Sequence, residues 1–301
     1  MNIYFGFLFV VLAAFGWGMV GVLARFLFVS GMEPAEVAFW RTVFGCILFS
    51  AAGVASKKMH LRASKDIFGF MAFGVVCLAS LFLCSMASVR EGGVALTVVL
   101  QYTAPAWVVL ISRVLFSESI TRAKCIAVLL SLTGVAIVSF SGSGGSHSYS
   151  LYGICLALLS GLLYALHIVG TKKLVTSYPS FAIFGYGFFF AALTLFPFVN
   201  FVDKSPADWG ILFILGFLCT FAPFFLYAIG LKYMEASTAS ITSTCEPVIT
   251  TVAAWLIWNE NLGLHGIFGM FLIISAVLIL IIAAAPTTFS QKKCRAAQDD
   301  A

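Results

Sequence analysis

Residues 101–118 read QYTAPAWVVLISRVLFSE, and residues 243–260 read STCEPVITTVAAWLIWNE. At an offset of 142 residues, Pro105 falls on Pro247 and Glu118 falls on Glu260, with an apolar run inside each pair. The run SGSGGS, which is a flexible linker by composition, lies between the two stretches at residues 141–146. Matches at a fixed offset on either side of such a linker predict a duplicated unit.

The composition restricts the class of protein. Of the 301 residues, 61% are hydrophobic and 10% are charged, whereas a soluble domain has about 45–50% apolar and about 25% charged residues. This excludes a water-soluble enzyme, a disordered chain and a nucleic-acid binder, and it predicts a polytopic membrane protein. Ten helices of about 20 residues each would use most of the chain, so no separate catalytic domain is expected.

Apolar stretches long enough to cross a bilayer recur along the whole chain. Lipid offers no partners to open backbone groups, and the runs are continuous where a β-barrel would alternate, so the spans are predicted to be helices. The expected fold is therefore an all-α integral membrane protein with ten transmembrane helices. The predicted spans are 4–28, 34–54, 67–88, 93–113, 122–140, 151–171, 180–200, 208–230, 236–258 and 264–284.

The spans divide into two repeats of five. Residues 4–140 form the first repeat, 141–150 the Gly/Ser-rich linker, 151–284 the second repeat and 285–301 a tail. Because five is odd, the second copy enters the membrane from the opposite side. Such inverted-topology repeats are common in secondary transporters, whose substrate site lies near the midplane at the repeat interface.

The distribution of basic residues predicts the orientation. One face of the ten-span arrangement holds 13 of the 17 lysines and arginines, which places it, both termini and the tail in the cytoplasm. The net charge of +5 is therefore interpreted as an orientation marker and gives little reason to expect an anionic partner. The first apolar run has no basic n-region and is too long for a signal peptide, so we expect an uncleaved span.

Several short motifs support a family resemblance. They are Gln101-Tyr102-Thr103-Ala104-Pro105 with Glu118, Glu246-Pro247 with Glu260, and Trp17-Gly18 in the first span, which a slightly different offset superposes on Tyr164-Ala165. Over roughly residues 6–140 and 151–284, the chain resembles the drug/metabolite transporter superfamily and its EamA-type ten-helix exporters. The resemblance implies a carrier without ATP hydrolysis, whose central cavity is lined by helices one, three, four, six, eight and nine.

The matched prolines have two interpretations. Pro105 and Pro247 each remove a backbone hydrogen bond within a predicted span. The freed carbonyl then needs a neighbouring group or a water-lined cavity, which would place both prolines beside the substrate site. Alternatively, they bend the helices for packing alone.

Three ionisable residues lie inside predicted spans, where charge is costly and usually faces the bundle interior. Glu246 is either a proton or cation coupling site or a structural acceptor beside Pro247. Arg41 either binds a substrate carboxylate or phosphate or forms a structural ion pair with Glu36 or Glu246. His167 is either a coupling residue that titrates near neutral pH or a hydrogen-bonded packing residue.

Other polar and aromatic residues complete the candidate site. Glu118 and Glu260, at opposite faces, are expected to cap the N-termini of neighbouring helices. Gln101 and Ser243 correspond across the repeats and can ring a site on the pseudo-twofold axis, with interhelical hydrogen bonding as the alternative. Aromatic residues whose polar groups need partners away from lipid are further cavity candidates; they are Trp17, Trp40, Tyr102, Trp107, Tyr164 and Tyr227.

The leading functional hypothesis is a secondary carrier that exports small metabolites, such as amino acids or related amphipathic solutes, across a bacterial inner membrane by alternating access. Its partners would be the solute and the bilayer, with no nucleic acid, and a homodimer is allowed. No metal or cofactor is expected, because no two of the eight cysteines form C-x-x-C; proton or cation coupling stays open.

Three alternatives remain. An exchanger of nucleotide-sugars or phosphorylated sugars would share the fold but should need several basic residues in its cavity. An intramembrane enzyme would need a nucleophile–base or metal constellation, and no H-E-x-x-H or G-x-S-x-G motif occurs, so the chain is not expected to be an enzyme. A channel would need a filter sequence, and none is evident.

Overall fold

The computed structural model describes residues 3–59, 61, 63–141, 150–259 and 263–299. Regular structure in these residues is helical throughout. Residues 142–149 of the predicted linker and Glu260 lie outside the described residues.

The first half contains α1 (Ile3–Val29), α2 (Pro34–Ala55), α3 (Asp66–Ala72), the π-helix η1 (Phe73–Ala79), α4 (Ser80–Gln101), α5 (Ala104–Phe116) and α6 (Arg122–Ser141). The second half contains α7 (Leu151–Leu174), α8 (Ser180–Leu195), the 3₁₀-helix η2 (Phe196–Phe198), α9 (Pro206–Gly216), the π-helix η3 (Phe217–Phe221), α10 (Ala222–Tyr233), α11 (Ala236–Ser243), α12 (Glu246–Trp258) and α13 (Leu264–Asp299).

The all-α membrane fold predicted from the sequence is confirmed. By length and composition, eight described helical segments can cross a membrane, and α5 is a shorter apolar helix. One of the eight, Asp66–Gln101, contains a break at Gly93, where φ is 80° and ψ is 168°. Gly93 separates the third predicted span from the fourth, and α11 with α12 forms the ninth, so the segments correspond to about ten crossings.

The two halves repeat the same backbone irregularities. The fourth span is broken between Gln101 and Ala104, and the ninth between Ser243 and Glu246. Both broken spans end on a left-handed residue, Ser117 with φ 56° and Asn259 with φ 51°, at the same offset of 142 residues. The π-helices η1 and η3 also occupy corresponding places, in the third and eighth spans. These shared features agree with the inverted five-helix repeats.

The prolines act differently from the sequence prediction. Pro105 is the second residue of α5 and Pro247 is the second residue of α12, so each begins a half-helix. An N–H in the first turn has no intrahelical partner in any case, and proline is therefore well tolerated there. The expectation that each proline removes a hydrogen bond in mid-helix was wrong, because the preceding helix has already ended four residues earlier, at Gln101 and at Ser243.

Each broken span is supported by the first helix of the other repeat. Helix α1 packs on α10, α11 and α12, while α7 packs on α4 and α5. Gly161 of α7 lies so close to the broken fourth span that a Cβ there would sit 2.7 Å from the Leu100 carbonyl oxygen. Gly18 of α1 lies close to the ninth span, where a Cβ would sit 2.9 Å from the Ile249 side chain, and its carbonyl accepts a hydrogen bond from Thr250 at 2.9 Å. The inverted repeats are therefore interlocked at the two helix breaks.

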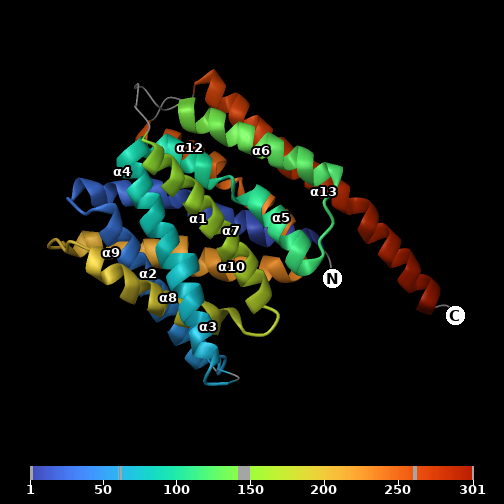
Figure 1. Cartoon of the computed structure of the whole chain (residues 1–301), viewed down its shortest axis with the longest axis horizontal. Helices are drawn as coiled ribbons and strands as arrows, with labels where there is room; N and C mark the ends of the chain where they lie inside the picture. Colours follow the sequence, from blue (N-terminus) through green and yellow to red (C-terminus); the bar gives the residue numbers. More distant parts are fainter. Residues whose placement is uncertain (1–2, 60, 62, 142–149, 260–262, 300–301) are drawn as a thin grey trace.

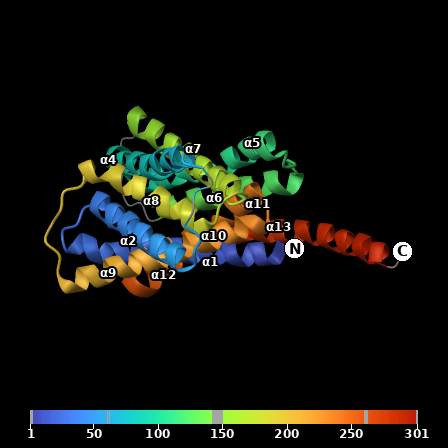
Figure 2. The ribbon, with the colours of Figure 1, turned by 90° about the horizontal axis from the view of Figure 1, so that it is seen from below.

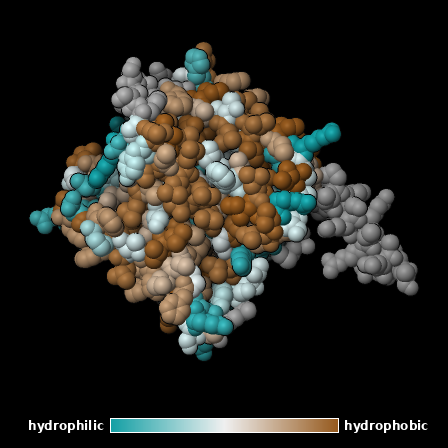
Figure 3. Space-filling model, viewed as in Figure 1, coloured by the Kyte–Doolittle hydropathy of each residue, from teal (hydrophilic) through white to brown (hydrophobic). Residues whose placement is uncertain are grey.

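The outer surface is apolar. Helices α6 and α13 lie side by side along one flank (Figures 1 and 2). Figure 3 shows hydrophobic residues over most of the visible face and hydrophilic residues near its edges. Large apolar side chains on the outside of α1 include Phe5, Leu8, Leu12 and Phe15, each about half exposed. Such a surface suits contact with lipid chains and would be unfavourable in water.

Candidate functional site

A small cavity, here called the central cavity, lies beside the helix breaks. Its volume is about 130 Å³, which is below the roughly 300–1,000 Å³ typical of ligand pockets. The sequence singled out six of its lining residues, which come from α1, α2, α4, α7 and α12. The lining consists of Trp17, Val20, Arg41, Leu78, Leu81, Phe82, Gln101, Tyr164, His167, Phe224 and Glu246.

Arg41 is buried and held in place by the eighth span. Its Nε donates to the Thr220 hydroxyl and its Nη2 to the Cys219 carbonyl oxygen, both at 3.2 Å. In an α-helix the Cys219 carbonyl would accept from the N–H four residues later, but residue 223 is proline and has none. Cys219 lies in the π-helix η3, and the arginine supplies a side-chain donor to its carbonyl in this irregular stretch of the span.

Glu246 is the first residue of α12 and is partly buried. A carboxylate is favourable there because the helix N-terminus carries partial positive charge. The Tyr102 hydroxyl lies beside this carboxylate. Glu246 and Arg41 line the same cavity, so the central cavity contains one acidic and one basic side chain at the junction of the two repeats.

A second cavity, here called the side cavity, adjoins the first. It has a volume of about 510 Å³ and lies between α4, α6 and α12. Gln101 and Glu246 line both cavities, whereas Tyr102 lines the side cavity. The Ser85 hydroxyl donates to the Gln101 side-chain oxygen at 2.9 Å, which fixes the amide at the boundary. The boundary between the two cavities is thus formed by polar side chains from the two broken spans.

His167 lies in the wall of the central cavity and is 2% exposed. Its ring is surrounded by those of Phe73, Tyr164, Phe184 and Phe224, with centroids 5.4–6.4 Å away. Neither ring nitrogen has a hydrogen-bond partner among the described residues. The packing interpretation made from the sequence assumed a hydrogen-bonded histidine, and the structure does not provide that bond.

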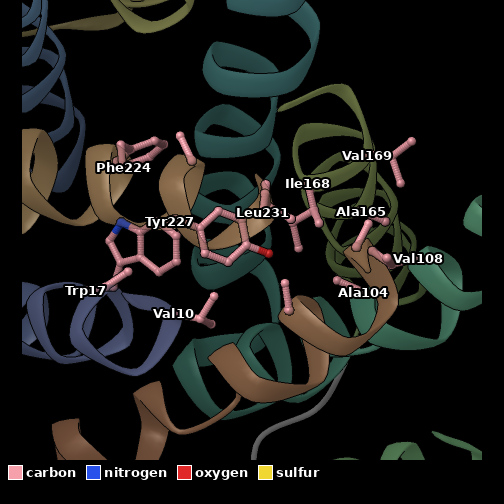
Figure 4. Close-up of a cluster of buried hydrophobic side chains, with 14 of the residues drawn as sticks. Val10, Trp17, Ala104, Val108, Ala165, Ile168, Val169, Phe224, Tyr227 and Leu231 are labelled. Carbon is pink, nitrogen blue, oxygen red and sulfur yellow. The ribbon is translucent and has the colours of Figure 1, made fainter. Parts of the chain in front are cut away.

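The side of the molecule that carries Ile3, Ser119 and Glu235 is here called the N-terminal face. A packed layer of side chains, here called the plug, closes the central cavity toward this face. Figure 4 shows Tyr227 at its centre, with Trp17 and Phe224 on one side and Leu231 and Val10 beside it. The Trp17 ring lies 5.1 Å from that of Tyr227. Along α10, Phe224 lines the cavity, Tyr227 and Leu231 are at most 1% exposed, and Tyr233 reaches the N-terminal face.

Tyr227 and Ser243 therefore lie behind the cavity wall. The Tyr227 hydroxyl lies near that of Ser243, yet it has no partner of hydrogen-bond geometry among the described residues. Ser243 donates instead to the Ser240 carbonyl at 2.8 Å, within its own helix. Trp107 is 38% exposed and lies outside the linings of both cavities.

Trp40 is likewise not brought to the central cavity. Its ring packs on that of Trp209 at 4.7 Å, and its Nε1 donates to Glu36 at 3.3 Å. Glu36 forms a buried ion pair with Lys204 at 2.5 Å, with the Lys204 ammonium 5.4 Å from the Trp40 ring centre. The suggested pairing of Arg41 with Glu36 is therefore corrected, because Lys204 is the partner of Glu36.

Glu118 lies at the N-terminal face, at the start of α11. Its carboxylate accepts from the backbone N–H of Ala236 at 2.7 Å and of Ser237 at 3.1 Å, and from the Ser237 hydroxyl. Lys124 lies 3.9 Å from this carboxylate and 2.6 Å from that of Glu235. The arrangement joins the end of the fourth span to the start of the ninth. Its counterpart in the sequence, Glu260, is outside the described residues.

Sequence reasoning missed the residues that support the site. Thr220 and Cys219, which hold Arg41, lie about 180 positions away from it in the chain. The one local signal was Pro223, a proline inside an apolar run. Leu78, Leu81 and Phe82 also line the cavity, but apolar residues in an apolar span give no signal.

Taken together, an all-helical membrane fold of inverted repeats, with a charged pair in a cavity beside two broken helices, defines a membrane transporter. Matching to known families agrees: residues 4–140 and 151–282 match the EamA-like transporter family. Because this match covers nearly the whole chain, the protein belongs to that family. It is accordingly a multi-pass membrane protein.

The relatives are also named as transporters. The uncharacterized transporter YwfM of Bacillus subtilis is 28% identical over 301 residues, covering 98% of each chain. The uncharacterized inner membrane transporter YicL of Salmonella typhimurium is 27% identical over 91% of this chain and 94% of its own. The pseudopaline exporter CntI of Pseudomonas aeruginosa is 26% identical over 91% and 95%. These names point to a non-enzyme.

A solved crystal structure shares the fold. It superposes with a TM-score of 0.82 and covers 94% of this chain and 98% of its own, at 17% sequence identity. At that level of identity the likeness is one of architecture alone.

Proposed function

We propose that this protein is a secondary carrier that exports small amphipathic solutes, amino acids among them, by alternating access. The observation that carries the proposal is that Arg41 and Glu246 line the same small cavity, together with Trp17 and Phe224. The cavity lies where the two repeats meet, which is where inverted-repeat transporters bind substrate.

The charges suit a zwitterion. The guanidinium of Arg41 can pair with a carboxylate through its planar fork of donors, and Glu246 can accept hydrogen bonds from an ammonium group. A solute with both groups offsets both protein charges, so neither is left unpaired when water is displaced. The aromatic wall would pack on the apolar part of the solute.

A phosphorylated or nucleotide-linked sugar suits the cavity less well. Among the described lining residues of the central cavity, Arg41 is the one basic side chain, and Glu246 opposes it. Two phosphate groups would leave negative charge unbalanced in a site of low polarity. The small volume argues in the same direction.

Alternating access would use the plug and the side cavity. The plug closes the cavity toward the N-terminal face, while Gln101 and Glu246 separate it from the side cavity. We infer that the two repeats rock about the helix breaks, so that these two barriers open in turn. On the basis of the lysine and arginine distribution, we place the N-terminal face in the cytoplasm of a bacterium and the protein in its inner membrane, as a monomer or homodimer.

Counterflow in proteoliposomes tests the function. Vesicles preloaded with unlabelled amino acid should accumulate the labelled form, and Arg41→Gln should abolish this. Arg90→Gln is the matched control, because the Arg90 side chain is 74% exposed and pairs with the exposed Glu33, so transport should be unchanged. Absence of counterflow for every amino acid, with the protein folded, would refute the proposal.

The energy source can be measured in the same vesicles. We propose that no organic cofactor is needed and that a proton gradient drives transport, with Glu246 or His167 as the coupling residue. A pH gradient should then accelerate uptake by the wild type, and Glu246→Gln or His167→Gln should remove the acceleration. Uptake insensitive to the gradient would leave a carrier without proton coupling.

A further inference from the structure

The imidazole of His167 has two unsatisfied polar atoms in the wall of the central cavity. The side chain is 2% exposed, and neither Nδ1 nor Nε2 meets a hydrogen-bond partner within the described part of the chain. A neutral imidazole carries one donor and one acceptor. Burying both without partners costs free energy, and such a cost in a folded protein calls for a reason.

Four aromatic rings pack around His167. Phe73 comes from η1, Phe184 from α8 and Phe224 from α10, and Tyr164 stacks on the ring from one turn earlier in α7. These rings pack against the imidazole, but none of them forms a hydrogen bond with its nitrogens. His167 also lines the central cavity, from which a bound solute can supply the partner.

We propose that His167 is a specificity-determining residue, which hydrogen-bonds a neutral polar group at the far end of a solute whose charged end lies between Arg41 and Glu246. This inference rests on the proposed function and deepens it. It assigns the solute class as zwitterions with an uncharged polar tip, such as a hydroxyl or carboxamide, in preference to those with a purely apolar side chain.

The preference for a polar tip follows from the lack of a hydrogen-bond partner for His167 among the described residues. Because His167 has no hydrogen bond to the described residues to give up, a bond to the solute recovers the cost of having buried the ring. An apolar solute of the same shape leaves the nitrogens unpaired, and sites built to hydrogen-bond a substrate group discriminate against analogues that lack it. A charged tip is disfavoured as well, since the surrounding aromatic side chains cannot neutralise it.

The size of the cavity agrees with a contracted state. At about 130 Å³ it holds a few water-sized volumes, and the nitrogens of His167 are closed off by the neighbouring rings. The cavity must widen around the solute before the bond can form. The unpaired imidazole favours that widening, because it gains a partner in the expanded state and has none in the contracted one.

Matched solute pairs test the inference on the full-length protein in nanodiscs. Valine and threonine, leucine and asparagine, and phenylalanine and tyrosine differ mainly in a neutral polar group, and their dissociation constants can be measured by calorimetry. Wild type should bind the polar member of at least one pair about threefold to tenfold more tightly, as expected for one hydrogen bond. His167→Phe should remove the preference, and His167→Gln, which keeps a donor and an acceptor, should retain it.

His265→Phe is the matched control. His265 lies exposed at the start of α13, so this variant should keep the wild-type preference. The proposal is overturned if wild type shows no preference within any pair, or if folded His167→Phe binds with the preference unchanged. Binding of no amino acid by wild type would overturn the proposed function too, whereas equal binding of both members would overturn the role of His167 alone.

Discussion

Arg41 donates a hydrogen bond of 3.2 Å to the backbone carbonyl of Cys219, and so the first repeat contributes the charge while the second repeat orients it. This carbonyl cannot accept an α-helical hydrogen bond from the fourth residue after it, because Pro223 has no N–H. The cationic group of the central cavity is thus positioned by a defect in the eighth span. Substitutions at that defect should affect the site without touching the solute.

Pro223→Ala should weaken solute binding. Alanine supplies an N–H that competes with Arg41 for the Cys219 carbonyl, and the guanidinium loses part of its anchoring. We expect a loss of affinity of about threefold to tenfold, corresponding to one hydrogen bond, measured by calorimetry or counterflow. Pro34→Ala is the control, because Pro34 begins α2, where the missing N–H needs no partner. Equal effects of the two variants would show that anchoring of Arg41 does not matter.

Gly161→Ala should destabilise the protein. The added Cβ would lie 2.7 Å from the Leu100 carbonyl, near the end of α4, and from the Thr103 hydroxyl in the break of the fourth span. Overpacking of this kind costs about 1–3 kcal/mol, which thermal or denaturant unfolding in detergent can detect. Gly21→Ala provides the comparison, since a Cβ there meets nothing within 4 Å. A Gly161→Ala protein as stable as Gly21→Ala would argue against close packing at the break.

The parts of the fold that could be predicted are those set by local chemistry. Continuous apolar runs predict spans because backbone groups must be satisfied inside the lipid, and the matched Pro105 and Pro247 revealed the repeat. The length of each apolar run and the offset between the matched prolines can be read directly from the sequence. Neither depends on the orientation of a side chain. The breaks themselves appear in the structure just before these prolines.

The orientation of side chains could not be predicted in the same way. Trp40 and Arg41 are adjacent, and adjacent residues point about 100° apart around a helix, so their side chains leave α2 in different directions. The structure directs Arg41 into the cavity and Trp40 onto Trp209. A uniformly apolar helix has no polar face to indicate which residue turns inward. The ion pair of Glu36 with Lys204 joins residues that are far apart in the chain, so no local sequence pattern indicates it.

Glu118→Ala should lower stability at the N-terminal face. The carboxylate accepts two backbone hydrogen bonds at the N-terminus of α11, and its removal leaves those donors buried without a charged acceptor. We expect a loss of about 1–3 kcal/mol in the free energy of unfolding. Glu33→Ala removes an exposed pair with Arg90 and should cost less than about 1 kcal/mol. If the two substitutions cost the same, Glu118 does not stabilise α11.

Tyr227→Phe should favour the state in which the plug is closed. The Tyr227 side chain is 1% exposed, and its hydroxyl has no hydrogen-bond partner among the described residues. Removing an unsatisfied buried hydroxyl should stabilise the packed plug by about 1 kcal/mol or more, and a ligand-free protein should unfold at a higher temperature. Because opening of the plug then becomes less favourable, counterflow should slow while the protein stays folded. Tyr152→Phe is the control, since Tyr152 is 64% exposed on α7 and should leave both measurements unchanged. Faster counterflow or lower stability in Tyr227→Phe would mean that the hydroxyl stabilises the closed plug.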